Sequence, residues 1–250
     1  MPKERSCVLS VAGFDPSGGA GVLADIKTFE QHKVQGMGAV TGLTFQNDSE
    51  FEGVKWVDTA EIEKQIEILF RKFKFDFIKI GMIRDLEVLG KITSSRLQAQ
   101  NPNVIWDPIL KASAGFEIHK TIDKKKVIDI CSSIYLITPN ADEVKILTGE
   151  NDEVKGAKEL SQYCNVLLKG GHSEKNKAKD HLFTTEGKVF PFRPKKISPM
   201  GKHGSGCVLS SAITANLANG LSLQRACLRG KDYVTKFIMS NKSLLGHHKI

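Results

Sequence analysis

The sequence has no apolar run that approaches the roughly 18 residues of a membrane-spanning helix, and its first residues carry no apolar stretch typical of a secretory leader. Its five cysteines are widely spaced and include no CxxC pair, which argues against a zinc ribbon and against a disulfide framework. We therefore expect a reduced, cytoplasmic protein with no membrane partner.

Two further signatures are missing. The P-loop pattern G-x-x-x-x-G-K-[ST] does not occur. Lys and Arg number 36 against 28 acidic residues, a formal charge of +8, but this excess is spread along the chain apart from concentrations at 175–179 and 193–196. Because neither interleaved aromatic residues nor an arginine-rich helix accompanies these lysines, they indicate a solvated surface, and we expect no nucleic-acid partner. A positive field would also attract an anionic nucleotide.

Strand-like and helix-like segments alternate along the 250 residues, of which 40% are hydrophobic. We find no Pro/Ser-rich linker, internal repeat or low-complexity tract, so we predict a single domain over residues 1–250. Repeated alternation predicts an α/β fold with a central, mostly parallel sheet covered by helices on both faces. The predicted strands are 6–12, 37–45, 75–80, 104–106, 134–137 and 166–169, with a hairpin between about 179 and 192. The predicted helices are 21–33, 59–73, 86–99, 127–131, one from 142, one from 152, and two that follow the loop ending at 207 and meet at 219–220.

A glycine-rich turn near the C-terminal end opens directly into a predicted helix. Residues 201–207 read Gly-Lys-His-Gly-Ser-Gly-Cys, and small and apolar residues follow them. The first N–H groups of a helix lack acceptors and carry the positive end of the helix dipole, and glycines let an anion approach them. We therefore expect Gly204, Ser205 and Gly206 to hold a phosphoryl group. The same field favours the thiolate form of Cys207. A cysteine at such a position is also often no more than a small buried apolar residue.

Glycines and polar residues also follow the other predicted strands, at Gln46, Asp107, Asn140, 13–21 and 170–171. Because the carboxyl ends of parallel strands share one edge of the sheet, and ligands of open α/β sheets bind there, these positions predict a single site.

The segment Gly19–Ala24 offers a different interpretation, since it fits the dinucleotide fingerprint G-x-G-x-x-A. Phe14-Asp15-Pro16-Ser17 separates this segment from the first predicted strand, and no acidic residue lies within the second. The fingerprint requires its first glycine in the tight turn itself, so a dinucleotide-binding oxidoreductase is the weaker hypothesis.

Several separate blocks, in order along nearly the whole chain, closely resemble hydroxymethylpyrimidine/phosphomethylpyrimidine kinases of thiamin biosynthesis, which belong to the ribokinase superfamily. These blocks are 10–28, Thr44-Phe45-Gln46-Asn47, Lys79-Ile80-Gly81-Met82, Trp106-Asp107-Pro108-Ile109, Thr138-Pro139-Asn140, Leu168-Lys169-Gly170-Gly171-His172 and His203-Gly204-Ser205-Gly206-Cys207. The resemblance implies a three-layer α/β/α ribokinase-like fold and a homodimer. It also implies that ATP, with Mg²⁺, phosphorylates 4-amino-5-hydroxymethyl-2-methylpyrimidine and then its monophosphate.

The resemblance assigns roles to the residues of the transfer site. Gly204, Ser205, Gly206 and Cys207 match the family's anion hole, which would stabilise charge on the transferring phosphoryl group. Cys207 stands where sugar kinases of the superfamily carry an Asp base, so it would accept the proton of the substrate hydroxyl.

Other matched positions would bind the nucleotide and the metal. Lys169 matches a lysine that reaches the nucleotide phosphates, and Asn140 and Ser205 belong to the same nucleotide site. Asp107 and Glu143 match positions tied to Mg²⁺ and its waters, although Glu143 also fits an ordinary helix surface.

For the pyrimidine, Gln46 is the principal candidate. Its carboxamide presents a donor beside an acceptor, which matches a ring nitrogen next to an exocyclic amine. The resemblance adds Asp25 as a further substrate contact and places Gly13 and Met82 along the ring, although Met82 fits a core position equally well.

Three alternatives remain open. Pyridoxal kinases are relatives, although Gln46 together with Cys207 favours the aminopyrimidine. A non-catalytic pyrimidine sensor would need neither Asp107 nor Lys169. A Cys207–His203 hydrolase pair would lack an orienting third group. Two departures from the family concern nucleotide positioning: Ser205 stands where Thr is common, and residues 109–115 match loosely.

Overall fold

The computed structural model describes residues 4–95, 100–110, 122–170, 178–194, 196–197 and 201–249. Among these residues, the strands form one sheet in the order β3-β2-β1-β4-β5-β6-β7-β8-β9. The pairs from β2 through β1, β4, β5 and β6 to β7 are parallel, whereas the pairs β2–β3, β7–β8 and β8–β9 are antiparallel. The predicted mostly parallel sheet is confirmed. The strands are β1 (Cys7–Phe14), β2 (Gln35–Gln46), β3 (Phe51–Trp56), β4 (Phe77–Ile80), β5 (Asn103–Trp106), β6 (Leu136–Ile137), β7 (Asn165–Leu168), β8 (Asp180–Phe183) and β9 (Val189–Phe192).

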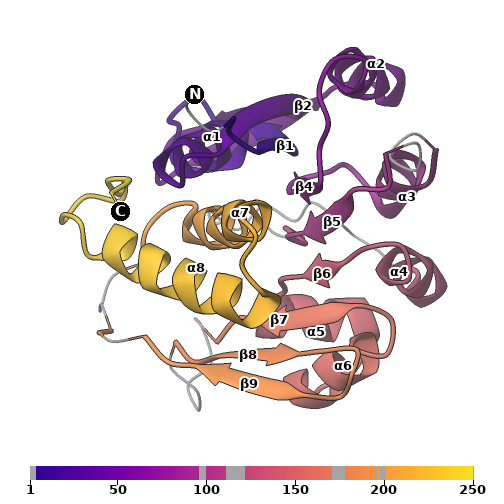
Figure 1. Cartoon of the computed structure of the whole chain (residues 1–250), viewed down its shortest axis with the longest axis vertical. Helices are drawn as coiled ribbons and strands as arrows, with labels where there is room; N and C mark the ends of the chain where they lie inside the picture. Colours follow the sequence, from indigo (N-terminus) through magenta and orange to yellow (C-terminus); the bar gives the residue numbers. More distant parts are fainter. Residues whose placement is uncertain are drawn as a thin grey trace.

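Helices cover both faces of this sheet, which gives the three layers seen in Figure 1. One layer contains α1 (Gly21–Gln31), α7 (Ser205–Ala218) and α8 (Leu223–Ile238). The other contains α2 (Thr59–Phe70), α3 (Leu86–Ser95), α4 (Lys124–Cys131), α5 (Ala141–Thr148) and α6 (Glu153–Leu160). Side chains alternate along the strands between two cores: Val104 and Trp106 belong to one, and Ile105 belongs to the other.

The helix α7 lies between the sheet and its own neighbours, so it has almost no solvent-facing side. Residues Cys207–Leu217 are all buried. A helix packed on every side needs small or apolar residues all round, which explains its sequence of Ser, Ala, Val, Leu and Ile.

The element boundaries follow local signals. Asn140 and Glu143 form a capping box at the start of α5, and Gly149, at φ 76°, ends that helix in the left-handed conformation. The predicted hairpin is confirmed, with Gly187 at φ 77° in its turn.

One strand was missed, and several predicted boundaries differ from the structure, among them 59–73, which is α2 (Thr59–Phe70), and 75–80, which is β4 (Phe77–Ile80). The strand β3 was missed because it is an edge strand in which no residue is fully buried. The helix predicted for 21–33 ends at Gln31, since Lys33 takes φ 59°. The strand predicted for 134–137 shortens to β6. Residues 96–99 of the helix predicted for 86–99 lie outside the described residues.

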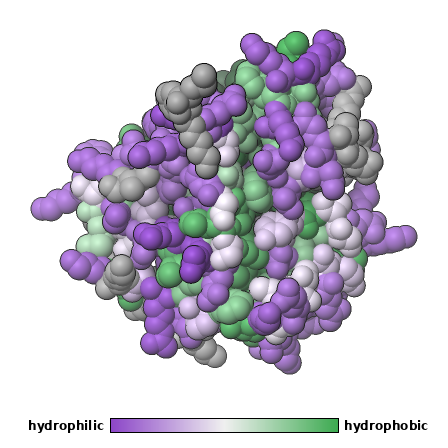
Figure 2. All heavy atoms as spheres, viewed as in Figure 1, coloured by the Kyte–Doolittle hydropathy of each residue, from purple (hydrophilic) through white to green (hydrophobic). Residues whose placement is uncertain are grey.

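Hydrophilic residues dominate the outer parts of the face in Figure 2, and a strip of hydrophobic residues runs through its centre. None of the helices in the described ranges is long and apolar enough to cross a membrane.

Candidate active site

A cavity of about 1040 Å³ lies at the carboxyl ends of the parallel strands. Residues from the ends of β1, β2, β4, β5 and β7 line it, together with the first turn of α7 and the start of α5. The topology therefore brings together residues that the sequence spreads over almost 200 positions. The predicted site residues that line this cavity are Gly13, Gln46, Met82, Asp107, Asn140, Glu143, Lys169, Gly204, Ser205, Gly206 and Cys207.

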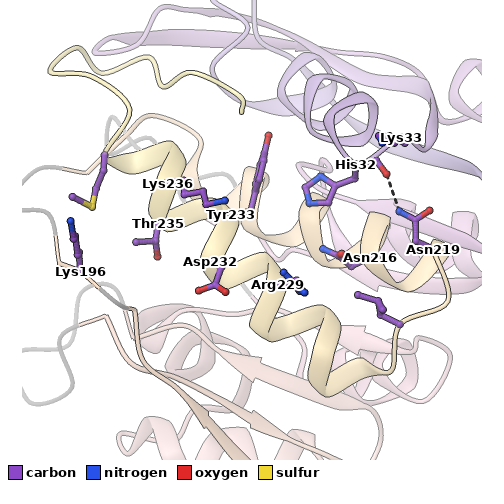
Figure 3. Close-up of a pocket in the computed structure, with 12 residues that line it drawn as sticks. His32, Lys33, Lys196, Asn216, Asn219, Arg229, Asp232, Tyr233, Thr235 and Lys236 are labelled. Atoms are coloured by element: carbon purple, nitrogen blue, oxygen red, sulfur yellow. Dashed lines mark hydrogen bonds between the residues drawn. The ribbon is translucent and has the colours of Figure 1, made fainter. Parts of the chain in front are cut away.

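A second cavity of about 830 Å³ lies along α8, near the C-terminal ends of α1 and α7 (Figure 3). Four of the side chains that line it are cationic: Lys33, Lys196, Arg229 and Lys236. None of the predicted site residues lines this cavity, so it is not the candidate active site.

The loop before α7 is held against the loop before α1. Gly204 takes φ 68°, and a Cβ atom at this position would lie 2.0 Å from the carbonyl oxygen of Gly19. Only glycine fits this approach. The first turn of α7 faces an ion pair, because a Cβ on Gly206 would lie 3.6 Å from Nζ of Lys169 and 4.0 Å from Oδ2 of Asp107. The N–H groups of Gly206 and Cys207 have no acceptor within the helix, so this end of the cavity attracts anions.

Lys169 connects two carboxylates. Its Nζ lies 2.8 Å from Oδ1 of Asp107 and 3.8 Å from Oε2 of Glu143. Hydroxyl groups of Thr138 and Ser210 also donate to Asp107, at 3.0 and 3.1 Å. Burial alone would raise the pKa of Asp107, but Lys169 and Lys79 lower it below its ordinary value. The Asp107 side chain is therefore a carboxylate.

Glu143 behaves differently from Asp107. Burial raises its pKa to about 7, although Lys169 acts in the opposite direction. Its Oε2 accepts the N–H of Asn140 at 2.7 Å, and Oδ1 of Asn140 accepts the N–H of Glu143 at 2.8 Å. Asn140 and Glu143 thus fix each other at the start of α5.

The donor chemistry around Lys169 fits a partly hydrated Mg²⁺ ion. No group of three or more His, Cys, Asp or Glu residues that could enclose a metal occurs in the described part of the chain. Asp107 and Glu143 supply two carboxylates beside the expected phosphate position, and Mg²⁺ in phosphoryl-transfer sites typically takes one or two protein carboxylates, waters and substrate phosphates.

Cys207 lines the cavity, but its thiol does not have the lowered pKa predicted from the sequence. Burial raises the pKa of Cys207 to about 11, and Asp107 and Asp25 raise it further, while Lys79 and the N–H of Gly21 lower it. The predicted thiolate is wrong for the ligand-free protein, because loss of hydration outweighs the positive groups nearby.

The opposite end of the cavity is formed by the ends of β1, β2 and β4. A Cβ on Gly13 would lie 2.3 Å from Cε of Met82, so glycine leaves the space that the Met82 side chain occupies. Thr41 donates to the carbonyl oxygen of Met82 at 2.6 Å and fixes this turn. Gln46, half-buried at the end of β2, adds a polar group to this end of the cavity.

Asp25 is the predicted site residue that does not line the cavity. Its side chain is 0% exposed and pairs with Lys79, which is also 0% exposed. This position contradicts the predicted direct contact with substrate. The sequence places Asp25 one turn into a helix near the site, but only the packing shows that its carboxylate turns toward the sheet.

The sequence did not indicate how His203 is held. Nε2 of His203 lies 2.8 Å from Oδ2 of Asp15, and the same oxygen accepts the N–H of Ala20 at 2.8 Å. A carboxylate that orients His203 is therefore present, contrary to the expectation from the sequence. This carboxylate, Asp15, holds the imidazole against the loop before α1. The residues Asp15-Pro16-Ser17 are typical of a turn, and the N–H of Ser17 does donate to Asp15 at 2.9 Å. This local pattern indicates the turn but not the contact with His203.

The segment after α8 also supports the loop before α7. Nζ of Lys202 donates to the carbonyl and side-chain oxygens of Asn241 and to the carbonyl oxygen of Ser243. The N–H of His203 donates to the carbonyl oxygen of Leu244 at 3.0 Å. Gly171 and His172, residues 175–177 and residues 111–115 lie outside the described residues.

Comparison with known proteins gives a consistent result. The family model for phosphomethylpyrimidine kinase matches residues 15–250. A hydroxymethylpyrimidine/phosphomethylpyrimidine kinase from Aquifex aeolicus is 34% identical over 251 residues, covering 94% of this chain and 95% of its own. Among solved structures, phosphomethylpyrimidine kinase from Clostridium difficile is 32% identical, with a TM-score of 0.77 over 93% of this chain and 99% of that one. An ADP complex of Bacillus subtilis pyridoxal kinase is 26% identical, with a TM-score of 0.85 over 98% of this chain and 97% of that one.

Proposed function

Since this chain belongs to the phosphomethylpyrimidine kinase family, we propose that its cavity carries out two successive phosphoryl transfers from ATP. The chain is a ribokinase-like phosphotransferase of thiamin biosynthesis, with 4-amino-5-hydroxymethyl-2-methylpyrimidine as its first substrate and the monophosphate of that compound as its second.

One observation carries the proposal at the level of residues. The first turn of α7 and the Lys169–Asp107 pair face each other in the same cavity that holds Gln46 at its other end. A phosphoryl group in transit between a nucleotide and a pyrimidine would lie between these two ends. The N–H groups of α7 and the Lys169 ammonium would stabilise the charge that develops on its oxygens.

The nucleotide phosphates would lie against Lys169, Asn140 and Ser205. Asp107 and Glu143 would hold Mg²⁺, which neutralises phosphate charge when it is bound. The Asp107 carboxylate is ionised and lies beside Lys169. Lys169 would therefore bind a phosphate oxygen while Asp107 binds the adjacent metal ion.

Cys207 would accept the proton of the substrate hydroxymethyl group. Its thiol is protonated in the ligand-free protein, so the first transfer requires its ionisation, which Lys79 and the N–H of Gly21 favour. The second substrate offers a phosphate oxygen that is already anionic near neutral pH, so the second transfer needs no base.

Gln46 would recognise the pyrimidine through one donor and one acceptor, while Gly13 and Met82 pack against the ring.

Pyridoxal is the competing substrate, because pyridoxal kinases share the fold. A coupled assay of ADP release with the hydroxymethylpyrimidine, its monophosphate and pyridoxal tests the proposal. Turnover of both pyrimidines is the expected result. Turnover of pyridoxal alone would replace our assignment, and absence of turnover with all three would favour a sensor.

We further propose a single-domain, cytoplasmic homodimer whose partners are ATP and the aminopyrimidine. Leu43 and Phe45 on β2 are 43% and 56% exposed beside the edge strand β3, and they offer an apolar surface for pairing. Light scattering on the purified protein tests the dimer, and Phe45→Glu should weaken it if this surface is used.

A further inference from the structure

One buried carboxylate joins four elements beneath the active site. Nζ of Lys79 on β4 lies 3.0 and 2.9 Å from the two carboxylate oxygens of Asp25 on α1. Ser10 on β1 donates to Oδ2 of Asp25 at 2.5 Å, and Ser211 on α7 donates to Oδ1 at 2.6 Å. All four residues are 0% exposed. We call Asp25, Lys79, Ser10 and Ser211 the Asp25 cluster.

Stability alone is a poor explanation for this cluster. Removing two charges from water costs about as much as their attraction returns, and well-packed apolar residues often replace a buried ion pair without loss. Gly81 shows how closely Lys79 is accommodated, since a Cβ there would lie 2.9 Å from Nζ of Lys79 and 3.2 Å from Cβ of Ala12. The Lys-Ile-Gly spacing therefore leaves room for the ammonium group.

The cluster lies next to Cys207. Ser211 follows Cys207 by one turn on the same helix. The charged groups that act on the Cys207 thiol are Lys79 from β4, Asp25 from α1, Asp107 after β5 and Lys169 after β7. Lys79 lowers the pKa of the Cys207 thiol and Asp25 raises it, so the two members of the pair act on the sulfur in opposite directions.

We propose that Lys79 and Asp25 are positioning residues of the phosphoryl transfer. They hold the second turn of α7, through Ser211, against β1, β4 and α1, and their two opposite charges act on the Cys207 thiol one turn earlier on the same helix. They do so without touching substrate, because none of the four residues of the Asp25 cluster lines the cavity. This inference rests on the proposed function for its kinetic readout.

A matched pair of substitutions on α7 tests the mechanical part. Ser211→Ala removes the hydroxyl that binds Asp25. Thr214→Val removes a buried hydroxyl that donates only to the helix carbonyl of Ser210 in the described structure, at 2.8 Å. We expect Ser211→Ala to lower kcat roughly 10-fold with KM for the pyrimidine within about 2-fold, whereas Thr214→Val changes neither by more than about 2-fold.

Alkylation of Cys207 tests the electrostatic part without any substrate. Iodoacetamide is applied to the ligand-free protein between pH 7 and 9, and modification of Cys207 is followed by mass spectrometry of its peptide. Lys79→Met removes the cation and should slow alkylation roughly 10-fold at a given pH. Asp25→Asn removes the opposing anion and should accelerate it. Loosened packing alone would move both variants in the same direction.

Three results would overturn the inference. A higher KM at unchanged kcat in Ser211→Ala and Asp25→Asn would mean that the cluster binds substrate. Equal losses in Ser211→Ala and Thr214→Val would mean general packing. Alkylation rates that shift together, or not at all, would remove the electrostatic role. If Lys79→Met does not fold, Ser211→Ala and Asp25→Asn still decide the outcome. Failure of the proposed function is seen separately, as absence of pyrimidine turnover in the wild-type protein.

Discussion

Two Lys–Asp ion pairs of this sheet have nearly the same length and different surroundings. Lys79 and Asp25 are 2.9 Å apart and both side chains are 0% exposed. Lys169 and Asp107 are 2.8 Å apart, but the Lys169 side chain is 14% exposed and faces the cavity at Gly206. The enclosed pair has no route to a ligand and can act only through its neighbours. The open pair can exchange its internal partners for phosphate oxygens and a metal ion.

The largest expected effect concerns the stability of the enclosed pair. Lys79→Met leaves the Asp25 carboxylate buried without a cation, which should lower the free energy of unfolding by about 3–5 kcal/mol. Adding Asp25→Leu removes the orphaned charge and should restore about half of that loss or more, while kcat stays low. Urea unfolding of both single variants and the double variant measures the coupling. If the stability losses of the two single variants simply add in the double variant, Lys79 and Asp25 are not coupled, which would contradict their description as an enclosed ion pair.

Lys169→Met should have the opposite profile to Lys79→Met, with a large loss of activity and a small loss of stability. We expect kcat to fall roughly 10²–10³-fold, because a donor to the transferring phosphoryl group is lost. Water can enter the cavity, and Thr138 and Ser210 still donate to Asp107, so the free energy of unfolding should fall by only about 1–2 kcal/mol. Steady-state kinetics and urea unfolding test both parts. Lys124→Met, which removes a surface pair with Glu159, is the control.

Cys207→Ala should separate the two transfers. The first transfer should slow roughly 10²-fold because the hydroxymethyl oxygen must lose its proton to a base. The second should slow less than about 10-fold, since its phosphate oxygen is already anionic. Rates measured separately with each pyrimidine decide this, and equal losses would assign Cys207 a packing role only.

The smallest expected effect is the pH dependence of the first transfer, which links Lys79 of the enclosed pair to Cys207 in the cavity. Because the pKa of Cys207 is raised to about 11, its thiolate fraction is small at pH 7 and rises roughly 10-fold for each pH unit up to pH 9. The ratio of the first rate to the second should therefore rise by about that factor in wild-type protein. Lys79→Met, which raises the pKa further, should move this rise to higher pH. A ratio that does not change with pH would contradict the base role.

The positions of Gln46, Asp107 and Lys169 could be predicted because each lies at the carboxyl end of a predicted strand, and the carboxyl ends of parallel strands meet at one edge of the sheet. The raised pKa of Cys207 could not be predicted, since the helix dipole is a local property while desolvation depends on everything packed around the sulfur. Asp15 and His203 are 188 positions apart, and no local pattern pairs them.

The sequence by itself determined the alternation of strands and helices, the glycine turn before α7 and the residues at the strand ends, because periodicity and backbone freedom are local properties. Tertiary structure alone decided which carboxylate is enclosed and which is open. Asp25 and Asp107 are chemically identical, and only the packing of α1 and α7 on the sheet withdraws Asp25 from the cavity and leaves Asp107 beside it.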